Sequence, residues 1–206
     1  MAITIINYGI GNINSIYSMY KNLGIKVKVS ESINDIKNAT RLILPGVGAF
    51  DKGIRELRRN NLEDVLNEAV INQKKPIMGI CLGYQLFFST SEEGSEKGLS
   101  WINGSIKKLK KSNDIKLRYP HMGWNGIQPH FEHPIFEGLD NNMRFYFAHS
   151  YYVKCITPSD ILASSIYGHK FTSAILKENI IGFQFHPEKS LKWGMKILYN
   201  FANVSI

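Results

Sequence analysis

The sequence predicts an α/β fold in which a doubly wound, largely parallel central sheet is extended by antiparallel strands in the C-terminal half. Three observations carry this prediction. Short apolar runs stop at glycine turns, and stripes of apolar residues at helical spacing follow them. After residue 98, short apolar segments separated by Asn, Gly and Pro replace this pattern. Alternating strands and helices are typical of parallel sheets, because each crossover helix covers one sheet face.

The N-terminal half contains four short predicted strands. Residues 3–7 form a nearly continuous apolar run that stops at the glycine turn of residues 8–12, as a strand buried on both faces does. Residues 25–29 alternate apolar and lysine side chains, which indicates an amphipathic strand. The third and fourth runs are Arg41-Leu42-Ile43-Leu44 and Ile77-Met78-Gly79-Ile80.

Three apolar stripes predict helices, because their residues recur every three or four positions and therefore share one helix face. The first covers residues 13–23 and ends at Gly24, a common C-terminal stop. The second covers residues 62–70, between the third and fourth predicted strands. The third covers residues 191–202 and closes the chain.

The C-terminal half adds three predicted strand segments. They lie at residues 117–119, 144–153 and 180–185 and are bounded by turn-forming residues. Their shortness and the lack of helices between them indicate hairpins. We therefore expect them to extend the same sheet in antiparallel fashion.

Composition indicates one soluble domain. The chain has 206 residues, 44% of them hydrophobic, so we expect a single domain over residues 1–206. Twenty-five basic and 17 acidic residues give a net charge of +8, but only 20% of residues are charged, which excludes a disordered basic chain. No apolar run approaches the roughly 18 residues that span a bilayer, and the N-terminus lacks a basic signal region. We expect a cytoplasmic protein without membrane contact.

Cys81 has the pattern of a catalytic nucleophile. It lies between a predicted strand and a helical stretch, with Gly79 and Gly83 two positions away on either side. In such a nucleophile elbow the sharp turn leaves no room for neighbouring side chains and lifts the nucleophile above the sheet edge. The helix N-terminus favours a thiolate, and the Leu82 N–H points to where an oxyanion would form. Cys155 lacks this setting and is expected to pack in the core.

A thiolate nucleophile needs a base, and the base needs an acceptor that orients it. Of the six histidines, His186 ends a predicted strand, and a possible acceptor, Glu188, follows two residues later. Pro187 keeps this step extended, so the two side chains point to the same side. We therefore predict a catalytic triad of Cys81, His186 and Glu188.

Three other patterns favour structural interpretations. His130-Phe131-Glu132-His133 lacks a second ligand pair, so we expect solvated histidines and no metal site. Gly9-x-Gly11 is too short for a dinucleotide fingerprint, and we expect no cofactor. A basic cluster near Trp101 and Tyr119 lacks any nucleic-acid motif, so a solvated face or an acidic partner is expected rather than nucleic acid. Its members are Lys107, Lys108, Lys110, Lys111, Lys116 and Arg118.

Residues 79–85 together with residues 185–188 resemble the class I, or triad, glutamine amidotransferases, and the likeness covers essentially the whole chain. Within this superfamily, further segments look like the glutaminase subunit of imidazole glycerol phosphate synthase. The most specific is Pro120-His121-Met122-Gly123-Trp124-Asn125. The others are residues 7–12, 45–50 and 149–152. One departure is Tyr84, where that family more often has methionine.

The resemblance implies a mechanism. Cys81 attacks the carboxamide of glutamine, His186 protonates the departing ammonia, and Glu188 orients His186. Water then hydrolyses the thioester. The implied oxyanion hole consists of Leu82, Val47 and Gly48, and the peptide orientation of the 45–48 segment responds to a partner. The residues implied to contact glutamine are Gly48, Gln85, Glu93, His149, Ser150 and Tyr151.

A single glutaminase site implies a partner subunit. Ammonia released into water would be protonated and lose nucleophilicity, so it must pass through a channel to an acceptor site elsewhere. In the resembling family the partner is a (β/α)-barrel cyclase, and the heterodimer forms imidazole glycerol phosphate and aminoimidazole carboxamide ribotide in histidine biosynthesis. The residues implied to lie near this interface are Asn12, His121, Trp124, Tyr146 and Lys189.

Three alternatives remain open. A paralogue with the same chemistry could supply ammonia to a surface-sugar amidotransferase, and the Tyr84 departure hints at it. A stand-alone cysteine hydrolase of related topology would act without a partner and has no use for residues 120–125. A basic binding module would bind nucleic acid in a salt-sensitive manner, and this binding would survive Cys81→Ala.

Overall fold

The computed structural model describes residues 3–110 and 119–204, and ten strands of this part of the chain form one central sheet. The main strand order is β2-β1-β3-β4-β12-β11-β10-β7, and β9 pairs with β11 and with β5. Five neighbouring strands are parallel: β1 (Ile3–Ile6), β2 (Val27–Ser30), β3 (Arg41–Leu44), β4 (Ile77–Ile80) and β12 (Ile180–Phe183). Antiparallel pairing adds β5 (Gly104–Lys108), β7 (Gln128–Pro129), β9 (Tyr151–Cys155), β10 (Ile161–Tyr167) and β11 (His169–Lys177). The predicted fold class is confirmed.

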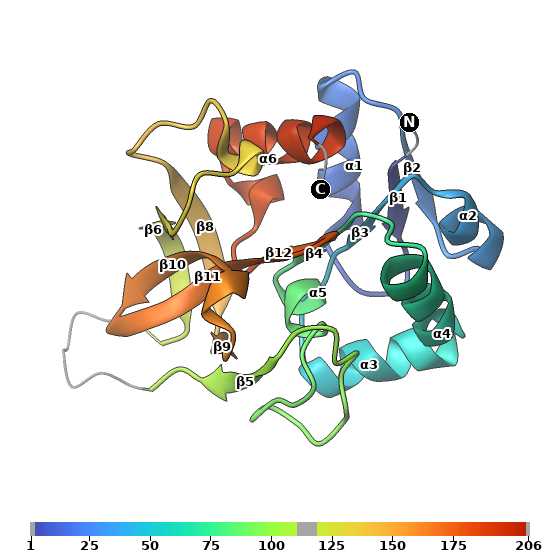
Figure 1. Ribbon diagram of the computed structural model, residues 1–206, viewed down its shortest axis with the longest axis horizontal. Helices are drawn as coiled ribbons and strands as arrows, with labels where there is room; N and C mark the ends of the chain where they lie inside the picture. Colours follow the sequence, from blue (N-terminus) through green and yellow to red (C-terminus); the bar gives the residue numbers. More distant parts are fainter. Residues whose placement is uncertain (1–2, 111–118, 205–206) are drawn as a thin grey trace.

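Helices cover both faces of the parallel strands (Figure 1). On one face lie α1 (Ile13–Asn22) and α6 (Leu191–Asn203). The other face carries α2 (Ile33–Asn38), α3 (Phe50–Arg59), α4 (Leu62–Asn67) with a π-helical continuation at Glu68–Asn72, and α5 (Leu82–Gln85). Short 3-10 turns occur at Pro134–Phe136, Pro158–Asp160 and Pro187–Lys189. No helix of the described residues is long and apolar enough to cross a membrane.

The strands are apolar on both sides because each side faces its own core. In β3, Leu42 and Leu44 join the core beneath α3, α4 and α5, while Ile43 joins the core beneath α1 and α6. Successive strand side chains point to opposite faces, so a central strand covered on both sides cannot alternate with polar residues. This explains why the predicted strands appear as continuous apolar runs.

Most predicted elements of the N-terminal half are confirmed. Strands β1 to β4 and helix α1 lie within one or two residues of their predicted limits, as does α6 at the C-terminus. The 62–70 stripe is α4 and part of its π-helical continuation. Helices α2 and α3 lie in stretches where no helix was predicted, although Phe50, Ile54 and Leu57 of α3 have helical spacing and are buried.

The C-terminal half required more correction. The 180–185 segment is β12, which pairs in parallel with β4, and only its other edge is antiparallel, to β11. The 144–153 segment is not one strand: it divides at Ser150 into β8 (Arg144–His149) and β9. Strand β8 does not extend the central sheet, because it pairs with β6 (His121–Gly126) in a separate two-stranded sheet. Strands β10 and β11 were not predicted, because several of their buried positions are polar. Leu117 of the predicted 117–119 strand lies outside the described residues, as do Lys111, Lys116 and Arg118 of the basic cluster.

The turn from β4 into α5 depends on two glycines, as the sequence predicts. A Cβ atom on Gly83 would lie 1.9 Å from the carbonyl oxygen of Leu44, at the end of β3. A Cβ atom on Gly79 would lie 2.6 Å from the ring of Phe87 and 2.7 Å from the Cα of Tyr84. The close approach at Gly83 places the start of α5 directly against the end of the neighbouring strand.

We expect Gly83→Ala to destabilise the fold by roughly 1–3 kcal/mol or more, because the added methyl group overlaps backbone that cannot move independently. Gly126→Ala is the matched control, since its nearest non-neighbouring atom would be 3.9 Å from the new Cβ. The measurement is the free energy of unfolding in denaturant. Equal effects of the two substitutions would contradict the packing argument.

Candidate active site

A cavity of about 430 Å³ opens where β3, β4 and β12 end. Its lining includes most of the candidate residues. Those present are Val47, Gly48, Cys81, Leu82, Gln85, Glu93, His149, Ser150, Tyr151, His186 and Lys189. Glu188 lies behind His186 and does not line the cavity, and four of the five candidate interface residues lie outside its lining as well.

Cys81 is held in a conformation that ordinary residues rarely adopt. Its φ is 53° and its ψ is −108°, between the end of β4 and the start of α5. Its amide donates to the Phe183 carbonyl at 2.8 Å, and its carbonyl accepts from the Gln85 amide at 3.1 Å. Left-handed backbone at a non-glycine residue is costly and persists only where its surroundings fix it. The strand pairing and the first turn of α5 thus fix the thiol at the cavity wall.

His186 and Glu188 form a buried pair. Nδ1 of His186 lies 2.8 Å from Oε1 of Glu188, and the two side chains are 2% and 1% exposed. Because a carboxylate only accepts, Nδ1 donates the hydrogen. The backbone of His186 is fixed as well, since its amide donates to the Tyr146 carbonyl and its carbonyl accepts from the Ser190 hydroxyl. The two side chains face one another as predicted, but the predicted extended step at Pro187 is wrong: Pro187–Lys189 form a 3-10 turn, and this turn brings Glu188 back to His186.

The charge of His186 depends on its two neighbours. Burial alone would lower its pKa, but the facing Cys81 and the hydrogen-bonded Glu188 outweigh burial and raise the pKa to about 10. The raised pKa favours the imidazolium form of His186 beside Cys81. This is the charge state required to protonate a leaving group.

The amide of Leu82 already has an acceptor. It donates to the carbonyl of Gly46 at 3.3 Å, and the adjacent Pro45 carbonyl accepts from the Tyr8 hydroxyl at 2.7 Å. The predicted oxyanion-hole residues thus lie beside Cys81, but the carbonyl of Gly46 occupies the Leu82 donor. An oxyanion on a substrate would have to displace this carbonyl.

Gln184 is a buried site residue that the sequence analysis missed. Its Nε2 lies 3.8 Å from the sulfur of Cys81, and its Oε1 accepts from Nε2 of Gln85 at 3.0 Å. The Gln85 amide also donates to the Tyr151 carbonyl at 3.1 Å. The available signal was a single polar residue inside the apolar run that leads to His186.

Glu93 brings a carboxylate to the cavity. Its Oε2 accepts from the Phe50 amide at the start of α3 at 2.9 Å. Burial raises the pKa of Glu93, more than the Phe50 hydrogen bond lowers it. A cationic group of a ligand would offset this cost of burial, so Glu93 is suited to bind an ammonium group.

His149 is hydrogen-bonded to a second buried imidazole, that of His121. Nδ1 of His149 donates to the Tyr151 carbonyl at 2.8 Å, so Nε2 accepts from Nδ1 of His121 at 2.9 Å. The register of β6 and β8 pairs these two histidines directly. Burial lowers the pKa of His121 to about 4; burial and the neighbouring His121 lower that of His149 to about 3. Both rings are therefore neutral at physiological pH.

His121, one of the candidate interface residues, is buried. It is only 2% exposed, because its imidazole stacks between the rings of Tyr167 and Phe147. The other candidates are placed differently: Trp124 is 40% exposed and contacts Tyr146 edge-on, and the Lys189 ammonium lies 5.7 Å from the ring centre of Tyr146.

The remaining candidates have local roles. Asn12 precedes α1 and accepts from the Ser15 hydroxyl at 2.9 Å. His130 lies 2.8 Å from the Ser164 hydroxyl, and His133 accepts from the Ile135 amide at 3.1 Å. Cys155 is half-buried, and its thiol contacts the Thr157 carbonyl.

Comparison with known proteins defines the class first. The family model of class-I glutamine amidotransferases matches residues 4–204, and the chain belongs to this family. Two solved structures show the same fold: PurLQS from Thermotoga maritima (TM-score 0.73, 17% identity, 98% of this chain and 97% of that one) and a glutamine amidotransferase (TM-score 0.73, 16% identity, 98% and 99%).

More similar sequences narrow the class to one subfamily. Imidazole glycerol phosphate synthase subunit HisH 2 of Pseudomonas aeruginosa is 50% identical over 98% of this chain and 99% of its own length. HisH 2 of Methanococcus maripaludis is 47% identical (97% and 98%), and HisH of Leptospira borgpetersenii is 40% identical (98% and 100%). Within the class-I family, the chain thus groups with the HisH subunits.

Cys81→Ala is expected to lower the pKa of His186 from about 10, because burial then acts without the opposing effect of the sulfur. Titration of the imidazole protons by NMR measures this shift, and Cys155→Ala is the control. A raised folded-state pKa contributes stability below the unfolded value of 6.5 that is lost as the pH rises through about 10. The free energy of unfolding should therefore fall less over this interval in Cys81→Ala. An identical His186 pKa in Cys81→Ala and Cys155→Ala would show that the Cys81 sulfur does not raise it.

Proposed function

We propose that this chain is the glutamine-hydrolysing subunit of an imidazole glycerol phosphate synthase and that Cys81, His186 and Glu188 carry out the hydrolysis. The observation that carries the proposal is that Cys81 and His186 share the cavity wall, while buried Glu188 binds Nδ1 of His186 from behind. The names of the HisH relatives support the same activity.

The first half of the reaction forms a thioester. The thiolate of Cys81 attacks the carboxamide carbon of glutamine, and the carbonyl oxygen becomes an oxyanion. The Nε2–H of His186 then protonates the amide nitrogen, the C–N bond breaks, and ammonia leaves. His186 is neutral at this stage, and its Nδ1 still donates to Glu188.

The second half returns the site to its starting state. Nε2 of His186 takes a proton from water, and the hydroxide attacks the thioester carbon. When the C–S bond breaks, glutamic acid leaves, and Cys81 thiolate and His186 imidazolium are restored. No metal or cofactor enters either half of this reaction.

Substrate placement follows from the groups that face Cys81. Glu93 supplies the carboxylate for the α-ammonium group of glutamine, and residues 149–151 also line the cavity. Turning the Gly46 carbonyl away would free the Leu82 amide for the oxyanion, with the amides of Val47 and Gly48 close by. This rearrangement is the step on which a docked partner can act.

The partner in this proposal is a (β/α)-barrel cyclase subunit that receives the ammonia through a channel. Trp124, Tyr146 and Lys189 form its docking edge beside the cavity, together with the exposed Met122. The names of the relatives do not favour supply to a surface-sugar amidotransferase. Tyr84 does not support this alternative either, since its ring is fully buried against Gly182 and does not line the cavity.

Cys81→Ala should abolish ammonia release from glutamine, because no other group can form the thioester, while the variant still folds. Cys155→Ala removes the other cysteine and should retain activity. The assay measures glutamate formation with the cyclase subunit present. Glutamate formation by Cys81→Ala at the wild-type rate would refute the mechanism.

Trp124→Ala should weaken binding of the cyclase subunit by about 1 kcal/mol or more, because exposed aromatic side chains commonly anchor interfaces. Phe131→Ala is the matched control, since Phe131 has the same exposed fraction of 40% but lines a different cavity. Titration calorimetry gives the two dissociation constants. Stimulation of glutamine hydrolysis by a surface-sugar amidotransferase, with none by the cyclase and its ribotide, would overturn the partner assignment.

A further inference from the structure

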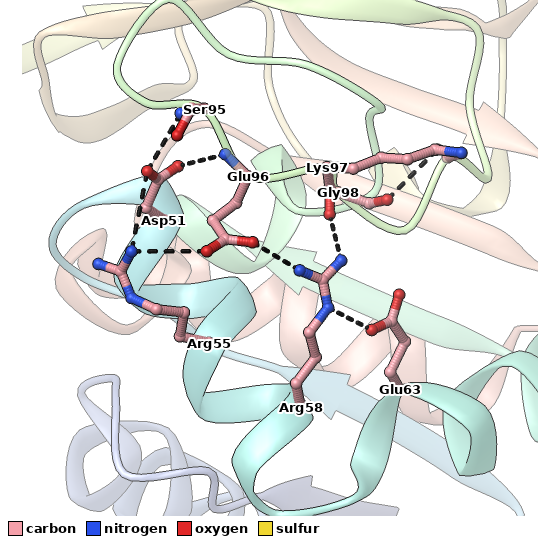
Figure 2. Close-up of polar contacts among 9 residues, drawn as sticks. Asp51, Arg55, Arg58, Glu63, Ser95, Glu96, Lys97 and Gly98 are labelled. Carbon is pink, nitrogen blue, oxygen red and sulfur yellow. Dashed lines mark hydrogen bonds and ion pairs between the residues drawn. The ribbon is translucent and has the colours of Figure 1, made fainter.

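The loop of residues 91–98 carries Glu93 to the cavity and lies along α3 (Figure 2). This 91–98 loop has little regular structure of its own, so its position depends on what holds it. Figure 2 shows charged side chains of α3 beside residues 95–97 of the loop, and Glu63 of α4 in contact with one of them, Arg58. These contacts are outside the catalytic residues described above.

Asp51, in the first turn of α3, binds the backbone of the loop. Its Oδ2 accepts from the Ser95 amide at 3.1 Å, and its Oδ1 accepts from the Glu96 amide at 3.0 Å. Burial alone would raise the pKa of Asp51, but these two amides and Arg55 outweigh burial and lower it. The loop is therefore bound by an ionised carboxylate, whose hydrogen bonds are stronger than those of neutral groups.

Gly94 allows the loop to approach this carboxylate. A Cβ atom at Gly94 would lie 1.9 Å from Oδ1 of Asp51, so a larger residue would displace either the loop or the Asp51 carboxylate and break their contact. Gly94 directly follows Glu93 in the chain. The position of the Glu93 backbone is thus set one residue away from the contact with Asp51.

Arg58 holds the same loop from the other end of α3. Its guanidinium donates to Oε2 of Glu96 at 2.6 Å, to the Lys97 carbonyl at 2.8 Å and to Oε2 of Glu63 at 2.7 Å. Arg55 lies 3.5 Å from the second carboxylate oxygen of Glu96. Exposed ion pairs add little stability individually, whereas a fork that engages three acceptors fixes geometry.

Glu93 is thereby held on two sides. Asp51 and Arg58 fix the residues that follow it, and the Phe50 amide binds its carboxylate directly. Since Phe50 begins α3 only two residues after Gly48, the same helix end also anchors the segment with the candidate oxyanion donors.

We propose that Asp51 and Arg58 are positioning residues for substrate recognition: they hold the 91–98 loop so that Glu93 meets the α-ammonium group of glutamine. This inference rests on the proposed function, in which glutamine is the substrate. Neither side chain lines the cavity, so both act through Glu93.

The test compares glutamine with glutaramate, which has the same carboxamide and carboxylate but lacks the α-ammonium group. Asp51→Asn keeps the shape of the side chain but presents one acceptor and one donor to two amide hydrogens. The glutamine-to-glutaramate ratio of kcat/KM should fall about tenfold or more, mainly through the KM for glutamine, because a charge-assisted contact is lost. The assay uses the complex with the cyclase subunit.

Three further variants separate positioning from general structural damage. Asp64→Asn makes the same chemical change at an exposed site on α4 and should leave the ratio unchanged. In a Glu93→Gln background, Asp51→Asn should lower the ratio no further, because the two residues act on one contact. Arg58→Lys keeps the charge but lacks the planar guanidinium fork that spans Glu63, Glu96 and the Lys97 carbonyl. It tests the loop should Asp51→Asn fail to fold.

The outcomes distinguish the two proposals. A wild-type chain that releases no ammonia from glutamine contradicts the proposed function. The positioning role alone is overturned if the wild type prefers glutamine but the Asp51 and Arg58 variants keep this preference. It is also overturned if these variants lose activity equally toward glutamine and glutaramate.

Discussion

The candidate site depends on one close backbone contact, between Gly83 at the start of α5 and the Leu44 carbonyl at the end of β3. This contact forces the turn after β4 to be sharp, and the sharp turn holds Cys81 in its left-handed conformation. It also brings the segment that follows β3 against the amide of Leu82. Nucleophile, candidate oxyanion donor and Gly46 carbonyl are therefore neighbours for a steric reason, before any substrate contributes.

The parts of the site that were predictable from sequence are those whose partners lie close together in the chain. The strand, glycine and cysteine order defines the elbow within a few residues, and His186 and Glu188 are two residues apart. Gln184 and the His121–His149 pair were not found, because their contacts depend on strand pairing between distant segments. Periodicity records which face is buried, but it does not record which strands are neighbours.

The same limit explains the errors in the fold. Strand β8 has the alternation of any half-buried strand, so its sequence could not show that β6 pairs with it outside the central sheet. Helix α3 was obscured by its many charges, yet those charges are what bind the 91–98 loop. Charged residues from a stretch where no helix was predicted thus hold part of the site in place.

The hydrogen bond between the Leu82 amide and the Gly46 carbonyl sets an energy scale for switching the enzyme on. One amide–carbonyl bond contributes a net free energy of roughly 1 kcal/mol, which corresponds to about a fivefold population ratio. This bond therefore disfavours the state with a free Leu82 amide only weakly. An isolated subunit would populate that state as a minor conformation. If the isolated subunit is to hydrolyse almost no glutamine, further interactions must disfavour the state with a free Leu82 amide until the partner is bound.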